Sequence, residues 1–318
     1  MMQIRAIFNR DGGTLRTMDV EALCARAVDI FEAGGHKLDC RIVSRDEVEA
    51  TLTEAGNDPK VEAIVIGGGD GTVSAAAAQA FKSGKPLGVL PAGTMNLFAR
   101  ALGMPLDLDA ALAAIAGGTI EQVDIATANG RPFVHQFGVG IHARLVRIRD
   151  GMVYRSRVGK MMASLRSVAA AAVNPPRFEV ELNGPGGKVK RTVSGIAVSN
   201  NPLDDSSVPV ARTLDSGRLG VYLADQLTTA ELAGLVMDLA TARWRTNALV
   251  SEAEVPRLHL HFPRRRRGNH AVIDGELISL DQHVELEVRP GGLAVFRPRE
   301  QKVGASEKNV GTNSRFRS

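Results

Sequence analysis

Hydrophobic and polar positions follow a repeating strand–helix pattern over the first 120 residues. Short apolar runs typical of buried strands occupy Gln3–Phe8, Leu38–Val43, Val61–Ile66 and Leu87–Leu90. Apolar residues spaced three or four apart predict helices between and after them, at Val20–Ala33, Arg45–Ala55, Val73–Phe81 and Leu108–Ile115. Strands that alternate with helices in this way predict an α/β fold with a parallel, doubly wound sheet.

The pattern changes after residue 120, where short alternating runs are separated by turn signals. Asn129-Gly130 predicts a hairpin between Val123–Ala128 and Pro132–Phe137, and Asp274-Gly275 is a second such signal. Many short strands with frequent turns predict a C-terminal antiparallel β-sandwich. Two helices are expected within it, at Val158–Val173 and at Thr228–Trp244, with Thr228 as the cap of the second.

These patterns divide the chain into three parts. We expect an α/β nucleotide domain over residues 1–122 and a β-sandwich substrate domain over residues 123–299. The remaining residues, 300–318, are polar and rich in Lys, Arg, Ser and Asn, so we expect them to be disordered.

Two glycine-rich loops follow consecutive strands in the first part. Gly67, Gly68, Gly69 and Gly71 surround a single acid, Asp70, and Thr72 follows as an expected helix N-cap. The second loop runs from Pro91 to Asn96 and contains Gly93 and Thr94. Glycine allows backbone to approach a ligand closely, and helix N-termini attract phosphate. An acid in such a loop would repel bare phosphate, which is reasonable if it holds a metal ion that bridges to the phosphates.

Common nucleotide motifs fit these loops poorly. A P-loop needs G-x-x-x-x-G-K-[ST], and no such run occurs. The dinucleotide fingerprint needs a glycine where Thr72 stands and an acid after the next strand, which Leu87–Leu90 does not supply. Two tight turns that bind no ligand are the alternative structural interpretation.

The two loops together resemble those of the diacylglycerol kinase catalytic-domain family, which includes sphingosine kinases and bacterial lipid kinases. Gly68-Gly69-Asp70-Gly71-Thr72 is similar to that family's nucleotide loop, and Pro91-Ala92-Gly93-Thr94-Met95-Asn96 with Phe98-Ala99-Arg100 is similar to its second loop. Phe137-Gly138-Val139-Gly140 resembles a family strand end. The resemblance covers roughly residues 3–298 and implies an α/β nucleotide domain followed by a β-sandwich, with the active site between them.

The resemblance also implies roles for particular residues. Asp70 would hold Mg²⁺ through the phosphates of ATP, and Asp274 of the Asp-Gly-Glu segment would support the metal. Glu276 would be the general base that accepts the proton of the attacking hydroxyl. Asp124 is expected as an interdomain acid that faces the cleft, with a capping or ion-pairing role as the alternative. The expected nucleotide contacts are Asn9, Gly68, Gly69, Gly71, Thr72, Gly93, Thr94 and Asn96.

The sequence also departs from the family pattern. Ser74-Ala75 stand where the family usually has Asn-Glu, and Asp215-Ser216-Gly217-Arg218-Leu219-Gly220 lacks two acids of a segment that binds structural Mg²⁺ in bacterial members. We therefore do not expect that structural metal site. The departures also leave the choice of lipid open.

Composition narrows the choice of partners. The net charge is +4 and only 4% of residues are aromatic, with no basic stretch interleaved with aromatics, so nucleic-acid binding is not expected. The basic run Arg264–Arg267 is either an anionic-membrane contact or a solvated loop.

His259 and His261 share one face of a strand, where surface histidines are favoured over a two-ligand metal site. Cys24 and Cys40 are expected as free thiols, which fits the cytoplasm.

The sequence therefore predicts an ATP- and Mg²⁺-dependent lipid kinase that acts on a lipid alcohol such as diacylglycerol or a sphingoid base. No apolar run approaches the ~20 residues of a membrane span, so a cytoplasmic protein with peripheral contact to anionic membranes is expected, with a homodimer as a candidate assembly. Two alternatives remain: a kinase of a soluble alcohol, because NAD kinase and phosphofructokinase use related Gly-Gly-Asp loops, and a non-catalytic nucleotide-binding regulator.

Overall fold

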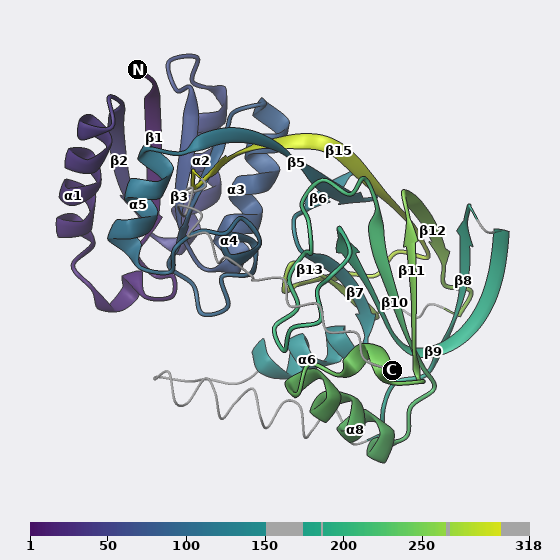
Figure 1. Cartoon of the computed structure of the whole chain (residues 1–318). Coiled ribbons are helices and arrows are strands. Elements are labelled where there is room, and N and C mark those ends of the chain that lie inside the picture. Colours follow the sequence, from purple (N-terminus) through teal and green to yellow (C-terminus); the bar gives the residue numbers. More distant parts are fainter. Residues whose placement is uncertain (151–173, 186, 265–267, 300–318) are drawn as a thin grey trace, which may run out of the picture.

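The computed structural model describes residues 1–150, 174–185, 187–264 and 268–299, and it has two lobes joined by a pair of long strands (Figure 1). The N-terminal lobe contains a parallel sheet in the order β2-β1-β3-β4. Its strands are β1 (Gln3–Asn9), β2 (Lys37–Val43), β3 (Ala63–Gly68) and β4 (Leu87–Pro91). The predicted parallel α/β sheet is confirmed.

The helices of this lobe form two packed pairs. One pair is α1 (Val20–Ala33) with α5 (Leu108–Ala116), and the other is α2 (Val48–Asn57) with α3 (Asp70–Ser83). Because parallel crossovers are right-handed, the reversal of strand order after β2 puts the two pairs on opposite faces of the sheet. Short turns complete the lobe: α4 (Leu97–Ala101) and the 3₁₀ helices Leu15–Thr17 and Arg45–Glu47.

The burial of the strands explains why the hydrophobic pattern of the sequence predicted these elements accurately. Every residue of β3 and β4 is buried, as expected for strands covered by helices on both faces, whereas β2 at the edge alternates in exposure. Helix α1 begins where predicted because the Asp19 side chain accepts a hydrogen bond from the Ala22 N–H.

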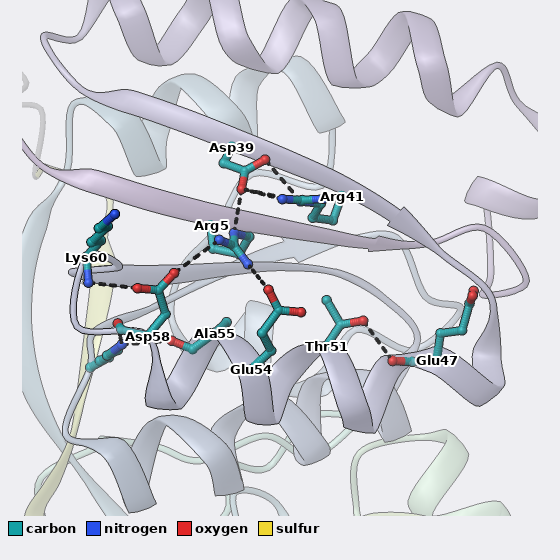
Figure 2. Close-up of polar contacts among 10 residues, drawn as sticks. Arg5, Asp39, Arg41, Glu47, Thr51, Glu54, Ala55, Asp58 and Lys60 are labelled. Atoms are coloured by element: carbon teal, nitrogen blue, oxygen red, sulfur yellow. Dashed lines mark hydrogen bonds and ion pairs between the residues drawn. The ribbon is translucent and has the colours of Figure 1, made fainter.

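One charged residue, Arg5, lies among the buried residues of β1. The side chain of Arg5 is only 8% exposed, and it forms ion pairs with Asp39 on β2 at 2.8 Å, with Glu54 on α2 at 3.3 Å and with Asp58 at 3.5 Å (Figure 2). Arg41 shares Asp39 from the solvent side. Arg5 therefore joins the edge strand to α2, and its three acidic partners compensate for the burial of its charge.

Among its described residues, the C-terminal lobe has antiparallel strands with the helices α6 (Ile141–Asp150) and α8 (Thr229–Ala240) and the 3₁₀ turn Trp244–Thr246. Its strands are β6 (Arg131–Phe133), β7 (Gln136–Gly140), β8 (Phe178–Gly184), β9 (Gly187–Asn200), β10 (Leu219–Asp225), β11 (Val250–Val255), β12 (Arg257–His261), β13 (His270–Ile273) and β14 (Glu276–Ser279). The antiparallel lobe is confirmed, and so is Thr228 as a helix cap, since it forms a capping box with Glu231.

Two long strands, β5 (Thr119–Ala128) and β15 (His283–Arg297), pair with each other and cross between the lobes (Figure 1). Val295 near the end of β15 pairs with Leu87 of β4 in parallel, so the strands of both lobes form one continuous sheet of 15 strands. The sequence pattern did not predict this continuity. Separate buried clusters still form in each lobe, and the boundary at residue 123 remains a prediction.

Cys24 on α1 and Cys40 on β2 form a disulfide, so the prediction of free thiols was wrong. Their Cα atoms are 6.0 Å apart because α1 packs on its neighbouring strand, a proximity that sequence spacing does not reveal. Three sequence predictions lie outside the described residues: the helix at 158–173, the last three residues of the basic run, 265–267, and the disordered tail at 300–318. In the described part of the chain no helix is long and apolar enough to cross a membrane.

Candidate active site

Three loops converge at the carboxyl end of the N-terminal sheet. The loop after β1 contacts the loop after β4, since the Thr14 N–H donates to the Ala92 carbonyl at 2.7 Å. A Cβ atom on Gly93 would lie 3.0 Å from the Gly69 Cα, and one on Gly12 would lie 3.3 Å from the Gly69 nitrogen. Side chains at these glycines would push the loops apart, so the glycines permit the close approach of three backbone segments.

Helix α3 begins at the centre of this junction. Its N-cap is Gly69 and it starts at Asp70, two residues before the predicted cap, so Thr72 lies inside the first turn. Instead of capping the helix, the Thr72 hydroxyl accepts a hydrogen bond from the Asn9 side-chain amide at 3.0 Å. The first N–H groups of a helix have no intrahelical acceptor, so Asp70, Gly71 and Thr72 present a positive helix end at the junction.

Asp70 joins two of the loops directly. One carboxylate oxygen accepts from the Leu97 N–H at 2.8 Å and the other from the Asn96 N–H at 3.3 Å, so Asp70 binds the start of α4. Within the second loop, the Asn96 side chain accepts from the Gly93 N–H at 2.7 Å and donates to the Pro91 carbonyl. Asn96 therefore shapes its own loop, and Asp70 holds that loop against α3.

Asp274 connects the C-terminal lobe to the same helix. It occupies the left-handed region of an Asp-Gly turn, with φ 47°, and it is buried. One oxygen accepts from the Ser74 hydroxyl at 2.7 Å and the Val134 N–H at 3.0 Å, and the other from the His135 and Gln136 N–H groups at 2.9 Å each. All four hydrogen bonds come from parts of the chain distant in sequence, so this carboxylate fixes β13–β14 against α3 and the segment after β6.

The same hydrogen bonds explain a difference from the predicted hairpin. The turn at Asn129-Gly130 is present, but the predicted strand Pro132–Phe137 is divided into β6 and β7. Val134, His135 and Gln136 all donate to Asp274. Strand β6 therefore pairs with β5, while β7 turns away to pair with β9 and β13.

Glu276 follows Asp274 by two residues and extends toward the first turn of α3. Its Oε1 would lie 3.4 Å from a Cβ atom on Gly71, and its Oε2 accepts from Arg131 at 3.0 Å in an ion pair whose side chains are about half exposed. The structure thus places Glu276 beside the glycine-rich loop, and Arg131 holds its carboxylate there.

Asp124 is buried and does not face the cleft, so of the two interpretations of this acid the structure agrees with the capping role. It is 1% exposed, and its carboxylate accepts from the Gly217 N–H at 2.7 Å and the Gly291 N–H at 3.0 Å. Both acceptor oxygens are used by backbone amides, so Asp124 holds the loop at Gly217 and the irregular segment of β15 at Gly291 in place. Asn201 accepts from the Ser216 N–H of the same segment, so side chains hold the loop that follows Asp215.

The Mg²⁺ that the family implies can be tested against these donors. Mg²⁺ is usually held by one or two carboxylates together with substrate phosphates and water. Partly exposed Asp70 fits that requirement, while Asp274 does not, because four donors already surround its buried carboxylate. Across residues 1–150, 174–185, 187–264 and 268–299, no three His, Cys, Asp or Glu side chains converge as metal ligands. The structure therefore shows Asp274 as an organising residue, and its role as a metal ligand stays a prediction that these four hydrogen bonds disfavour.

An apolar cavity of about 320 Å³ lies in the C-terminal lobe between α8, α6 and the strands β7, β9 and β10. Its polar lining includes His135, Gln136 and His142, and most of the rest is apolar, including Ile196, Leu203, Tyr222, Leu232, Leu235, Val236, Leu239 and Trp244. His135 and Gln136 are also residues whose N–H groups bind Asp274. The polar part of the cavity is therefore connected through a single carboxylate to Ser74 on α3.

His135 lies where this cavity meets the acidic residues. Desolvation lowers the pKa of the His135 imidazole, while the charges of Asp274 and Asp70 raise it by a smaller amount. The ring is therefore neutral near pH 7 and able both to donate and to accept a hydrogen bond.

Sequence reasoning missed Ser74, Arg131 and His135. Ser74 was regarded only as a departure from a family pattern, although it lies one helical turn after Asp70 and so on the same face of α3. No local signal identifies Arg131 or His135, because their partners Glu276 and Asp274 are about 140 residues away.

Comparison with known proteins agrees with this geometry. Residues 3–128 match the model of the diacylglycerol kinase catalytic domain, so this part of the chain is similar to that family. A Pseudomonas aeruginosa protein named "Probable lipid kinase YegS-like" is 27% identical, over 86% of this chain and 88% of its own length. A Staphylococcus saprophyticus diacylglycerol kinase is 25% identical, over 76% and 82%.

Other matches are partial or more distant. An uncharacterised Synechocystis protein is 29% identical over 74% of this chain, and the match spans only 55% of that protein. Two crystal structures of Bacillus anthracis proteins each cover 93% of this chain. The one titled as a putative diacylglycerol kinase has a TM-score of 0.75, and the one titled as a diacylglycerol kinase has a TM-score of 0.67. These TM-scores show a shared fold, and the sequence identities of 19% and 17% support nothing beyond the fold.

The role of Asp274 leads to a prediction about stability. In Asp274→Asn, an amide NH₂ replaces one acceptor oxygen and meets hydrogen-bond donors, while Asn still tolerates the left-handed backbone. We expect the free energy of unfolding to fall by about 2–3 kcal/mol in urea denaturation. Asp281→Asn is the matched control, because Asp281 is exposed and accepts one bond from Asn129, and it should change stability by less than about 0.5 kcal/mol. Equal effects of the two substitutions would contradict the organising role.

Proposed function

We propose that this protein is an ATP-dependent lipid kinase that transfers the γ-phosphate of ATP to the hydroxyl of a lipid alcohol, with diacylglycerol as the first candidate. The family relationship supports a lipid kinase, and the proposal adds the nucleotide, the acceptor and the residues. Its main support is an apolar cavity of about 320 Å³ whose lining includes His135 and Gln136. The backbone N–H groups of both residues donate to the carboxylate of Asp274, which also accepts a hydrogen bond from Ser74 on α3. A lipid chain in that cavity would have its polar end near the glycine-rich loops.

The proposed reaction is a single displacement. The acceptor oxygen forms a bond to the γ-phosphorus, the bond from that phosphorus to the β–γ bridging oxygen breaks, and ADP leaves. Glu276, beside Gly71 and oriented by Arg131, accepts the hydroxyl proton. The first N–H groups of α3 and the loop containing Gly93 and Thr94 bind phosphate oxygens.

Asp70 would hold the Mg²⁺ of the nucleotide, and the chemistry that this ion would supply is neutralisation of the charge that develops on the phosphate oxygens. Asp70 also keeps the second loop in place through the Asn96 and Leu97 N–H groups. Neutral His135 would orient the acceptor hydroxyl through a hydrogen bond.

An exposed apolar surface on α8, next to the cavity, supports a lipid substrate over a soluble alcohol. On α8, Leu235, Val236 and Leu239 line the cavity, while Met237 is 65% exposed and Leu239 is 39% exposed. Exposed apolar residues that continue into a cavity suit an interface with lipid. We propose that α8 contacts the membrane surface where the acceptor enters.

The proposal is tested first by transfer of labelled γ-phosphate to lipids in mixed micelles with Mg²⁺. We expect wild-type protein to label a lipid alcohol and Asp70→Asn to reduce the rate by at least about 100-fold, because the charge at the proposed metal position is lost. Asp19→Asn is the control, since Asp19 also accepts a backbone N–H at a helix start and Asn caps equally well. Label only in soluble products would favour the soluble-alcohol kinase, and ATP binding without transfer would favour a regulator.

The role of Glu276 predicts a separation of kinetic parameters. Glu276→Gln should lower kcat by about 10²-fold or more while the KM for ATP changes little, because a general base acts only in the transition state. Glu121→Gln, which removes an exposed carboxylate that is also paired with an arginine at 3.0 Å, should leave both parameters unchanged. A Glu276→Gln variant whose kcat stays near the wild-type value would exclude it as the base.

The cavity predicts discrimination by chain length. Val236→Trp should add bulk inside the cavity and raise the KM for long-chain lipid acceptors by about 10-fold, with a smaller effect on short-chain analogues. Met237→Trp places the same ring at the next, exposed position of α8 and is the matched control. If neither substitution changes the ratio of the KM values for long-chain and short-chain acceptors, the acyl chain binds elsewhere.

A further inference from the structure

Trp244 is the single tryptophan of the chain, and it lies in the wall of the apolar cavity. The 3₁₀ turn Trp244–Thr246 follows α8, and the Asn247 side chain donates to the Asp238 carboxylate at 2.6 Å, which ties this turn back to the helix. The indole is only 6% exposed, and its edge packs against the Tyr222 ring on β10, with the ring centroids 5.3 Å apart. The turn therefore places an indole ring against the sheet, on the surface of the cavity.

The N–H group of this indole is buried without an acceptor. The Nε1 atom of Trp244 has no hydrogen-bond partner among the residues that the structure describes. A buried indole N–H usually finds an acceptor, because a donor that leaves water and stays unpaired costs free energy. An unpaired buried donor in the wall of a cavity is explained if a ligand in that cavity supplies the acceptor.

The acceptors that pack beside the indole already have other donors. The Leu203 carbonyl accepts from the Arg245 guanidinium, and the Tyr222 hydroxyl accepts from the Leu203 N–H at 2.8 Å. Arg245 also lies over the indole, with its Cζ 5.0 Å from the ring centroid, and it forms ion pairs with Asp205 at 2.8 Å and with Glu252 at 2.9 Å. These contacts fix the position of the ring and leave its N–H for a group that enters the cavity.

The indole is separate from the polar part of the cavity lining. Its ring partner Tyr222 pairs with Ala197 of β9, which pairs in turn with Gly138 of β7. Adjacent strands lie about 4.8 Å apart, so Tyr222 is roughly 10 Å across the sheet from the strand that carries Gln136. A ligand whose polar end lies at His135 and Gln136 would therefore meet the indole with a part further along the molecule.

We propose that Trp244 is a specificity-determining residue whose indole N–H donates to a carbonyl oxygen of an acyl ester or amide in the lipid acceptor. This inference rests on the proposed function in taking a lipid acceptor as the occupant of the cavity. An indole N–H donates and cannot accept, so it recognises an acceptor atom and not an ammonium group. A carbonyl oxygen is the acceptor that an acylated lipid carries next to its hydrocarbon chain. A lipid with an ether bond in that place leaves the donor unpaired and is rejected.

The first test uses Trp244 as the probe, because no other tryptophan of the chain contributes to the emission. Its fluorescence is recorded while dioctanoylglycerol, or separately its dioctyl ether analogue, is titrated into the full-length protein in detergent micelles without ATP. We expect a saturable change in emission with the ester, and a concentration for half-saturation about 10-fold higher with the ether, because the ether lacks the carbonyl acceptors. The two lipids share the same hydroxyl and chain length, so the ratio reports on the carbonyl groups.

The Trp244→Phe variant tests the donor itself. Phenylalanine keeps an aromatic ring against Tyr222 and lacks the N–H. Because this variant has no fluorescent probe, binding of the two lipids, each labelled with tritium, is measured by equilibrium gel filtration for the variant and the wild type. We expect the ester to bind about 10-fold more weakly to the variant than to the wild type, and the ether to bind equally to both. A general loss of packing would weaken the binding of both lipids.

Three results would overturn the proposal. They are equal affinity of the wild type for the ester and the ether, a Trp244→Phe variant that still prefers the ester, and the absence of a saturable change in Trp244 emission with either lipid. The kinase proposal is judged separately. Binding that prefers the ester, without transfer of phosphate, would contradict the kinase and leave the role of Trp244 intact. Phosphorylation of both lipids with equal KM would contradict the role of Trp244 and leave the kinase proposal intact.

Discussion

The buried carboxylate of Asp274 is the interaction on which the arrangement of the two lobes depends. It accepts one hydroxyl hydrogen bond from α3 and three backbone hydrogen bonds from the segment between β6 and β7. An unsatisfied buried amide costs roughly 1–3 kcal/mol, so three of them strongly favour this one position of the turn. Glu276, two residues later, is therefore held beside the first turn of α3.

The continuous sheet gives this contact its geometric support. Strands β5 and β15 run through both lobes, and β15 pairs with β4 at one end and with β12 near the other. Asp124 of β5 accepts hydrogen bonds from the N–H groups of Gly217 and of Gly291 in β15, where these two strands pass between the lobes. A doubly wound nucleotide lobe and an antiparallel lobe with an apolar cavity thus share one framework, and the candidate active site lies where their loops meet.

Sequence pattern predicted much of this correctly. The parallel sheet, helix α1, the hairpin at Asn129-Gly130, the cap of α8 and the similarity of residues 3–128 to the diacylglycerol kinase catalytic domain were all predicted from local signals. The contacts of Asp124 and Asp274 were not predicted, for one common reason. Their sequence context shows an acid near a turn, whereas their function in the structure is set by backbone N–H groups from distant segments. The disulfide between Cys24 and Cys40 was missed because it depends on how a helix packs on a strand.

The sequence by itself determined most elements of this protein and the two loops that resemble the diacylglycerol kinase catalytic domain, because hydrophobic period, caps and glycine requirements act over a few residues. The tertiary structure alone decided which acid lies beside the glycine-rich loop and which acid connects the lining of the apolar cavity to α3. Those relationships join residues as much as 200 positions apart, as in the bond from Ser74 to Asp274. They depend on strand register and lobe packing, which no local sequence pattern specifies.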